Sequence, residues 1–78
     1  MLSDNDRRVL VAIERACREW DGYIPHGAAD WTAIRRLLAE RLVEPTNDFG
    51  DCQTCPEPHE GEIFVLTAHG LRHAAEEG

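Results

Sequence analysis

The sequence predicts a small α+β domain whose elements follow the order helix, helix, β-hairpin, helix. Apolar residues recur at helical spacing in two stretches of the first half. A run of β-branched and aromatic residues follows a long polar stretch in the second half. A chain of 78 residues supports one hydrophobic core at most, so residues 1–78 are expected to form a single domain.

The first helix has the clearest pattern. Ser3 is followed three residues later by Asp6, which is typical of a capping box at a helix start. The apolar stripe that should face the core consists of Val9, Leu10, Ile13, Ala16, Cys17 and Trp20. Gly22 is expected to end this helix.

A short extended segment and a turn should lead to a second helix. Pro25 favours extended backbone before it, and His26 is expected in a surface turn. Asp30 fits an N-cap, and the helix should end near Arg41. The residues expected on its buried stripe are Trp31, Ile34, Leu37, Leu38 and Leu42. Its exposed face should carry Thr32, Arg35, Arg36 and Ala39.

A hairpin and a last helix complete the chain. A first strand should begin at residues 42–44, and Pro45 confines it to a sheet edge or a short length. Residues 47–61 are polar and rich in Gly and Pro, which predicts a long loop before a second strand at 62–66. Thr67 can cap a helix over residues 68–77. The residues of that helix expected to face inward are Leu71, Ala74 and Ala75.

Charge and composition narrow the function classes. Fifteen acidic residues face eight arginines, with no lysine, so the chain as a whole repels polyanions. No stretch approaches the roughly 20 apolar residues of a membrane span, and the N-terminus lacks signal-peptide features, so we expect a cytoplasmic protein without a membrane partner. Ser3 is the only serine, and no glycine-rich phosphate loop follows a strand, so we do not expect an enzyme.

Cys52 and Cys55 have the spacing at which two thiolates share a Zn²⁺ ion, and His59 follows as a third ligand. The fourth ligand stays open. His69 and His73 are alternates, because the run Cys-x₂-Cys-x₁₃-His-x₃-His also fits a two-Cys, two-His zinc finger. The simpler interpretation is a pair of reduced thiols in a loop, so zinc is a hypothesis at this point.

Two segments resemble the winged helix-turn-helix domains of many prokaryotic regulators. They are Ile34-x-x-Leu37-x-x-x-Arg41-Leu42-Val43-Glu44 and Phe64-Val65-Leu66-Thr67-x-x-Gly70. The resemblance covers roughly the last two-thirds of the chain and implies a winged-helix-like fold in which residues 47–61 form the wing loop. It also implies that Thr32, Arg35 and Arg36, on the helix that enters the DNA major groove in that family, contact a partner or DNA.

The chain departs from the family pattern at two places. The family has a further helix and turn before the recognition helix, but residues 22–30 leave room for about two turns at most, so this middle helix should be short or missing. Arg41 occupies a position where the family usually has Gly, so it must adopt a left-handed conformation or end the helix differently.

Three functions are compatible with these features. The first is a non-enzymatic acidic binding module that docks on a basic protein partner as an adaptor or inhibitor, for example of a nucleic-acid-binding protein. The alternative is a DNA-binding transcriptional regulator, acting as a homodimer so that two weak half-sites add. The third is a small structural zinc-knuckle module. The first is favoured because the predicted wing carries five carboxylates and no arginine: Asp48, Asp51, Glu57, Glu60 and Glu62.

Overall fold

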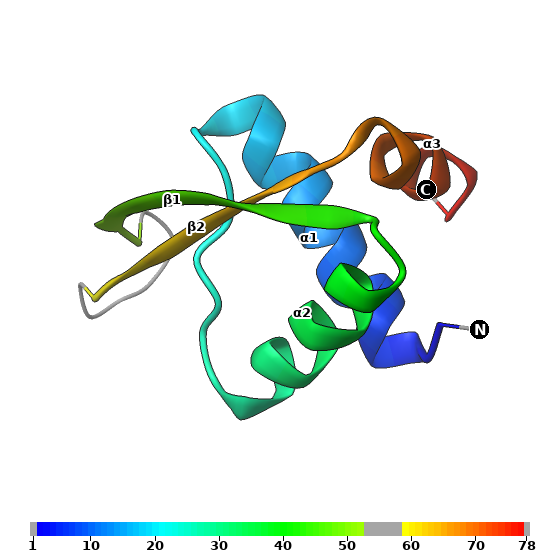
Figure 1. The fold of residues 1–78 in the computed structure, drawn as a ribbon, viewed down its shortest axis with the longest axis horizontal. Helices are drawn as coiled ribbons and strands as arrows, with labels where there is room; N and C mark the ends of the chain where they lie inside the picture. The colour runs from blue at the N-terminus through cyan, green and yellow to red at the C-terminus, as the bar shows by residue number, and fades with distance from the viewer. Residues whose placement is uncertain (1, 53–58, 78) are drawn as a thin grey trace.

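This computed structural model describes residues 2–52 and 59–77. In this part of the chain, three helices pack with one two-stranded antiparallel sheet, whose far end projects beyond them (Figure 1). The elements are α1 (Asp4–Glu19), α2 (Ala28–Ala39), β1 (Val43–Asp51), β2 (Glu60–Leu66) and α3 (Ala68–Glu77). The predicted α+β class and the order helix, helix, hairpin, helix are therefore confirmed. The arrangement is compatible with a winged-helix-like domain.

Helix α1 begins with the predicted capping box. The backbone N–H of Asp6 donates to Ser3 Oγ over 3.1 Å, and the backbone N–H of Ser3 donates to Asp6 Oδ2 over 3.0 Å. Four residues of the predicted stripe are buried: Val9, Leu10, Ile13 and Ala16. Cys17 and Trp20 are exposed, contrary to the prediction, because the last turn of α1 extends beyond α2 and α3 (Figure 1).

Residues 20–27, between α1 and α2, form no helix, so the middle helix of the winged-helix pattern is missing. Gly22 does not terminate α1, which already ends at Glu19; instead it turns the chain with a φ of +145°. A Cβ at this position would press against Ile63 and the Phe64 carbonyl oxygen. Only glycine therefore lets the connection run this close to β2.

Helix α2 differs from the prediction at both ends. It begins at Ala28, with Gly27 rather than Asp30 at the N-cap, because the Asp30 carboxylate is buried and accepts from the backbone N–H of His26. It ends at Ala39, and Arg41 then takes a φ of +61°, one of the two conformations expected for it.

The inner face of α2 is largely as predicted. Ile34, Leu37 and Leu42 are buried, and Leu38 is partly buried against them. Trp31 is 38% exposed rather than buried, and its ring lies edge-on to Phe64 with 5.6 Å between centroids. Trp31 thus covers the edge of the core without entering it.

The hairpin is longer than predicted, and residues 47–61 are not one wing loop. Residues 47–51 belong to β1 and residues 60–61 to β2, with Gly50 paired to Gly61. Pro45 does not shorten β1, because a two-stranded sheet leaves one side of every strand without a ladder partner. The register of the pairing shifts between Pro45 and Phe49, where Asn47 has a φ of +64°, and the strands then pair in the new register as far as Asp51.

Helix α3 follows β2 directly and is anchored on the end of α2. Thr67 caps it as predicted, accepting from the Gly70 backbone N–H over 3.0 Å and donating to the Arg41 carbonyl over 2.8 Å. A Cβ on Gly70 would overlap the Leu42 carbonyl. Because Gly70 and Ala74 point inward, Leu71 and Ala75 are exposed, contrary to the prediction.

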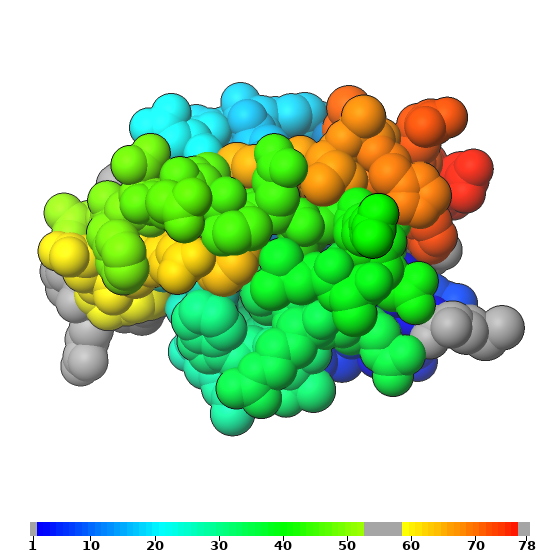
Figure 2. Space-filling model, viewed as in Figure 1, coloured from blue at the N-terminus to red at the C-terminus, as the bar shows by residue number. Residues whose placement is uncertain are grey.

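The core lies where α1 crosses α2 and the base of the hairpin. Its largest fully buried side chains are Val9, Leu10, Ile13, Ile34, Leu37 and Leu42. The far end of the hairpin projects away from this core, and the strands lie beside α2 on the face shown in Figure 2. Within the described residues, none of the helices has the length and apolar character that crossing a bilayer requires.

Candidate metal centre

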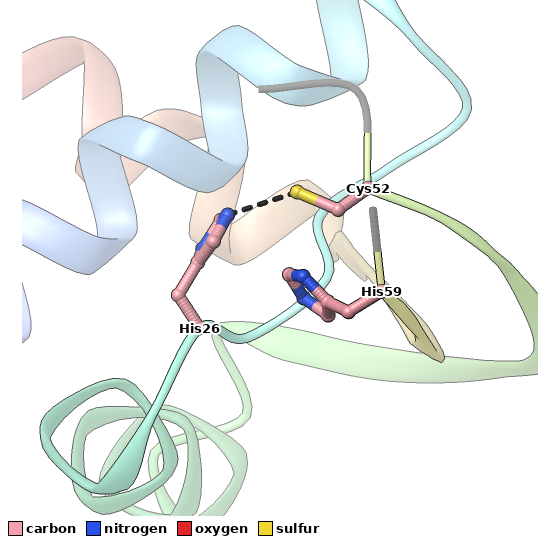
Figure 3. Close-up of side chains that lie close together, drawn as sticks. All are labelled: His26, Cys52 and His59. Atoms are coloured by element: carbon pink, nitrogen blue, oxygen red, sulfur yellow. Dashed lines mark hydrogen bonds between the residues drawn. The ribbon is translucent and has the colours of Figure 1, made fainter. Parts of the chain in front are cut away.

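Three potential metal ligands converge at the far end of the hairpin: His26, Cys52 and His59 (Figure 3). One ligand atom from each lies within 4.8 Å of the other two. His26 Nε2 is 3.0 Å from Cys52 Sγ, and the two imidazole rings meet edge to face with 5.3 Å between centroids. These residues could hold a metal ion.

The register of the hairpin positions two of the three ligands. Asp51 pairs with Glu60, and one step further the backbone N–H of Cys52 donates to the His59 carbonyl over 2.8 Å. Residues directly opposite each other in an antiparallel pair project their side chains to the same face. Cys52 and His59 are therefore neighbours because of backbone pairing.

A short pairing between the α1–α2 connection and β2 positions the third ligand. Tyr23 and Phe64 exchange two backbone hydrogen bonds, each 2.8 Å long, in an isolated antiparallel bridge. Since antiparallel chains run in opposite directions, each step from Tyr23 toward His26 matches a step from Phe64 back toward His59. The bridge thus directs His26 to the end of the hairpin where Cys52 lies.

Asp30 anchors the segment that carries His26. Its carboxylate accepts from the Tyr23 hydroxyl over 2.5 Å, from Arg8 Nη2 over 2.8 Å and from the His26 backbone N–H over 2.9 Å. Burial opposes ionisation of this carboxyl, but the three donors outweigh burial and lower its pKa to about 2. Burial and the hydrogen bond to Asp30 together raise the pKa of Tyr23. Asp30 is therefore a carboxylate at neutral pH and Tyr23 a neutral phenol.

This anchor also orients the imidazole of His26. Its Nδ1 lies 3.2 Å from the Tyr23 hydroxyl oxygen and 3.4 Å from Asp30 Oδ2. The hydroxyl already donates to Asp30, so it can accept from an Nδ1–H of His26. In that tautomer the lone pair is on Nε2, which faces Cys52. A carboxylate that orients the imidazole in this way is typical of metal-bound histidines.

His59 supplies an independent sign that the cluster fits a metal. Its Nε2 atom is buried and has no hydrogen-bond partner among the described residues. Buried polar atoms in folded proteins nearly always have a partner, and a lone pair directed at a cation would satisfy this one. The donor set of two imidazoles and one thiol suits a borderline metal ion better than Mg²⁺ or Ca²⁺.

The predicted ligands have different outcomes. Cys52 and His59 come together as predicted, whereas Cys55 lies outside the described residues. The alternates His69 and His73 lie on α3, outside the cluster. Their two rings lie edge to face, with 6.2 Å between centroids. The prediction of a surface turn for His26 missed its place in the cluster.

A signal for His26 was present in the sequence. The residues before it were predicted to be extended, and an extended segment can pair with a strand. Pairing with the strand after His59 in the antiparallel sense would bring the two histidines together. No ligand-spacing motif points to it, because 25 residues separate His26 from Cys52.

The predicted contact residues Thr32, Arg35 and Arg36 are exposed on α2. Thr32 Oγ1 donates to the Ala28 carbonyl over 2.9 Å. Within the described residues Arg35 and Arg36 form no ion pair, while each of the four arginines on α1 lies within 3.4 Å of a carboxylate oxygen. Of these two helices, α2 is therefore the one whose arginines have no carboxylate within ion-pair distance among the described residues.

No family model, curated protein or solved structure matches this chain.

Proposed function

We propose that the chain is a small, non-enzymatic binding module whose hairpin is held in place by a Zn²⁺ ion bound to His26, Cys52 and His59. The observation that carries the proposal is the convergence of three donor atoms within 4.8 Å of one another, from segments far apart in sequence.

Zinc is the ion that best suits this donor set. It binds thiolate sulfur at about 2.3 Å and imidazole nitrogen at about 2.0–2.1 Å in tetrahedral geometry, which places neighbouring ligand atoms roughly 3.3–3.7 Å apart. The 3.0 Å between His26 Nε2 and Cys52 Sγ needs only a small adjustment to accept the ion. Because of its spacing from Cys52, Cys55 is the residue to test for the fourth position.

A metal at this position would add a bond between the end of the hairpin and the His26 segment, which backbone pairing already brings together. The far end of the hairpin contributes almost no buried apolar surface: Phe49 is 66% exposed, and Asp51 is exposed. A domain of fewer than about 80 residues often needs a metal or a disulfide in addition to its core. Zinc would thus fix the hairpin against the His26 segment and add directly to folding stability.

The charge of the hairpin supports a basic protein as the partner. Within the described residues β1 and β2 carry no arginine, and their carboxylates are those of Glu44, Asp48, Asp51, Glu60 and Glu62. Such a surface attracts a positively charged partner and repels nucleic acid. We therefore favour an adaptor or inhibitor of a basic protein, with a nucleic-acid-binding protein as one example.

Native mass spectrometry of the reduced chain with added zinc tests the metal site. We expect one ion per chain, with uptake lost in His26→Ala and in Cys52→Ser. His69→Ala is the matched control, because it removes an exposed histidine outside the cluster and should bind like the wild type. Cys55→Ser tests the fourth position separately. Full retention of zinc after both His26→Ala and Cys52→Ser would refute the site.

The unpaired arginines of α2 favour one second candidate, a DNA-binding regulator that uses Thr32, Arg35 and Arg36. As a homodimer it could combine two half-sites. Fluorescence anisotropy with duplex DNA at about 50 mM salt tests this candidate. Binding that disappears in Arg35→Ala/Arg36→Ala but persists in Arg15→Ala would support it, and undetectable binding would exclude it.

A further inference from the structure

A groove of about 840 Å³ lies beside the metal cluster, between the C-terminal half of α1 and the hairpin. Its lining includes apolar side chains from both walls, among them Ala16, Trp20, Ile24, Phe49 and Ile63. Helix α1 and β1 are thus separated here by an apolar depression. Grooves of this kind accept the apolar face of a partner segment.

Two large aromatic side chains remain exposed in this groove. Trp20 is 40% exposed and Phe49 is 66% exposed, and one comes from each wall. Exposed aromatic pairs are unfavourable in water and are enriched at the centres of protein interfaces. Trp20 and Phe49 both line the groove, so each exposes apolar surface that a partner segment in the groove could cover.

The rim of the groove is acidic. Among its lining residues are three carboxylates, Glu19, Asp21 and Asp51, and one guanidinium, that of Arg15. Arg15 Nε lies 3.2 Å from Glu19 Oε1, so this positive charge is already matched within the rim. The formal charge of these four residues is therefore −2, which favours a cationic occupant.

We propose that the groove docks a basic amphipathic helix of a protein partner. The apolar face of that helix would lie on Trp20 and Phe49, and a flanking Lys or Arg side chain would reach Asp21 on the acidic rim. An acidic or purely polar segment fits neither the lining nor the rim. This inference rests on the proposed function and names the chemistry of the partner.

The metal cluster forms part of the same groove. His26 and Cys52 are among its lining residues, and β1, which ends at Asp51 just before Cys52, carries Phe49. An ion that fixes Cys52 to His26 also fixes the distance between the two aromatic walls. Binding of the helix should therefore be tighter in the presence of zinc than after chelation.

The test uses fluorescence anisotropy of a labelled synthetic peptide, about five helical turns of leucine and lysine with the leucines on one face. A peptide of the same pattern with glutamate in place of lysine is the negative control. We expect saturable binding of the lysine peptide only. Phe49→Ser should weaken it at least about tenfold, because an aromatic contact at the centre of an interface is removed.

Two further variants identify the surface. Asp21→Asn should weaken binding several-fold and reduce its salt dependence, because one rim charge is lost. Leu71→Ser is the matched control: this leucine is 54% exposed on α3, outside the groove, and its loss should leave binding unchanged. In a Trp31→Phe background, the emission of Trp20 should shift to the blue when the lysine peptide binds.

The outcomes separate the two proposals. Native mass spectrometry on the same variants reports zinc uptake, which Phe49→Ser should leave intact. If zinc binds but the lysine peptide shows no saturable binding, or if Leu71→Ser weakens it as much as Phe49→Ser, the groove proposal is overturned and the metal site stands. If the peptide binds with the expected dependence on Phe49 but no zinc is taken up, the groove stands and the metal site fails.

Discussion

The two ends of the hairpin are held by different forces. At its base Val43 and Phe64 are buried in the core, and Leu66 packs against it. At its far end Phe49 is mostly exposed, and the contacts are polar ones, between His26 and Cys52 and between Cys52 and His59. Apolar burial thus determines the position of the base, whereas hydrogen bonds and potential metal ligands determine the position of the end. Perturbations of the core and of the cluster should therefore have separable effects.

The largest effect is expected at the base, from Gly70→Ala. The added methyl group would overlap the Leu42 carbonyl, which is backbone and cannot move aside without shifting α3. We expect a loss of about 3 kcal/mol in the free energy of unfolding, measured by urea denaturation. Gly27→Ala is the control, since a Cβ there meets nothing within 4 Å; as a change at the N-cap of α2 it should cost about 0.5–1 kcal/mol, well below the loss at Gly70. Equal stability of the two variants would contradict the packing of α3.

The next largest change in the free energy of unfolding is expected from zinc binding at the far end of the hairpin. An ion that binds only the folded chain stabilises it by about 2.7 kcal/mol at a free concentration a hundred times its Kd. Hydrogen exchange should locate the effect: chelation should reduce protection of the Cys52 amide far more than that of core amides such as Leu37. An equal loss of amide protection at Cys52 and at Leu37 would indicate that zinc stabilises the whole domain rather than the far end of the hairpin alone.

Asp30 accepts hydrogen bonds from Tyr23, which pairs with buried Phe64, and from His26 of the cluster. Its replacement should therefore have an effect intermediate between those at the base and at the far end of the hairpin. Its folded-state pKa of about 2 lies below the ordinary value of 3.8. A carboxyl with a lowered pKa stabilises the fold above its unfolded-state pKa, and this stabilisation is lost as the pH falls through the folded-state pKa. In the metal-free chain Asp30→Asn should lower the free energy of unfolding by about 2 kcal/mol at pH 7. The difference from the wild type should shrink between about pH 4 and pH 2. Chemical denaturation at several pH values measures this, and a difference independent of pH would contradict it.

The smallest effect is expected at the turn between α2 and β1. Arg41 has a φ of +61°, which is costly for a residue with a Cβ and free for glycine. Arg41→Gly should therefore raise the free energy of unfolding by about 0.5–1 kcal/mol without affecting zinc uptake. The melting temperature is the readout, and a lower value would show that the arginine side chain contributes contacts that outweigh the strain.

The difference between the core and the far end of the hairpin also explains which features could be predicted from the sequence. The spacing of Val9, Ile13 and Ala16 predicted the buried face of α1, because helical periodicity is a local property. Capping by Thr67 was predicted for the same reason, and the structure adds the close contact of Gly70 with Leu42. Leu71 was placed wrongly because apolarity alone did not indicate that Gly70 faces the core.

The far end of the hairpin was harder to predict because it depends on backbone pairing. Apart from Phe49, residues 47–51 have weak strand propensity, yet they extend β1 by pairing with β2. Cys52 and His59 were found from local spacing. His26 was missed because its position depends on the bridge between Tyr23 and Phe64, which joins segments 41 residues apart.

The most direct test of the metal site is titration of the reduced chain with Co²⁺, which replaces zinc and absorbs visible light when bound in a tetrahedral site. We expect a sulfur-to-metal charge-transfer band and intense d–d bands that saturate at one equivalent and disappear on addition of zinc. Both should be absent in His26→Ala and Cys52→Ser and retained in His69→Ala. A wild-type spectrum identical to that of free aqueous Co²⁺ would contradict the account.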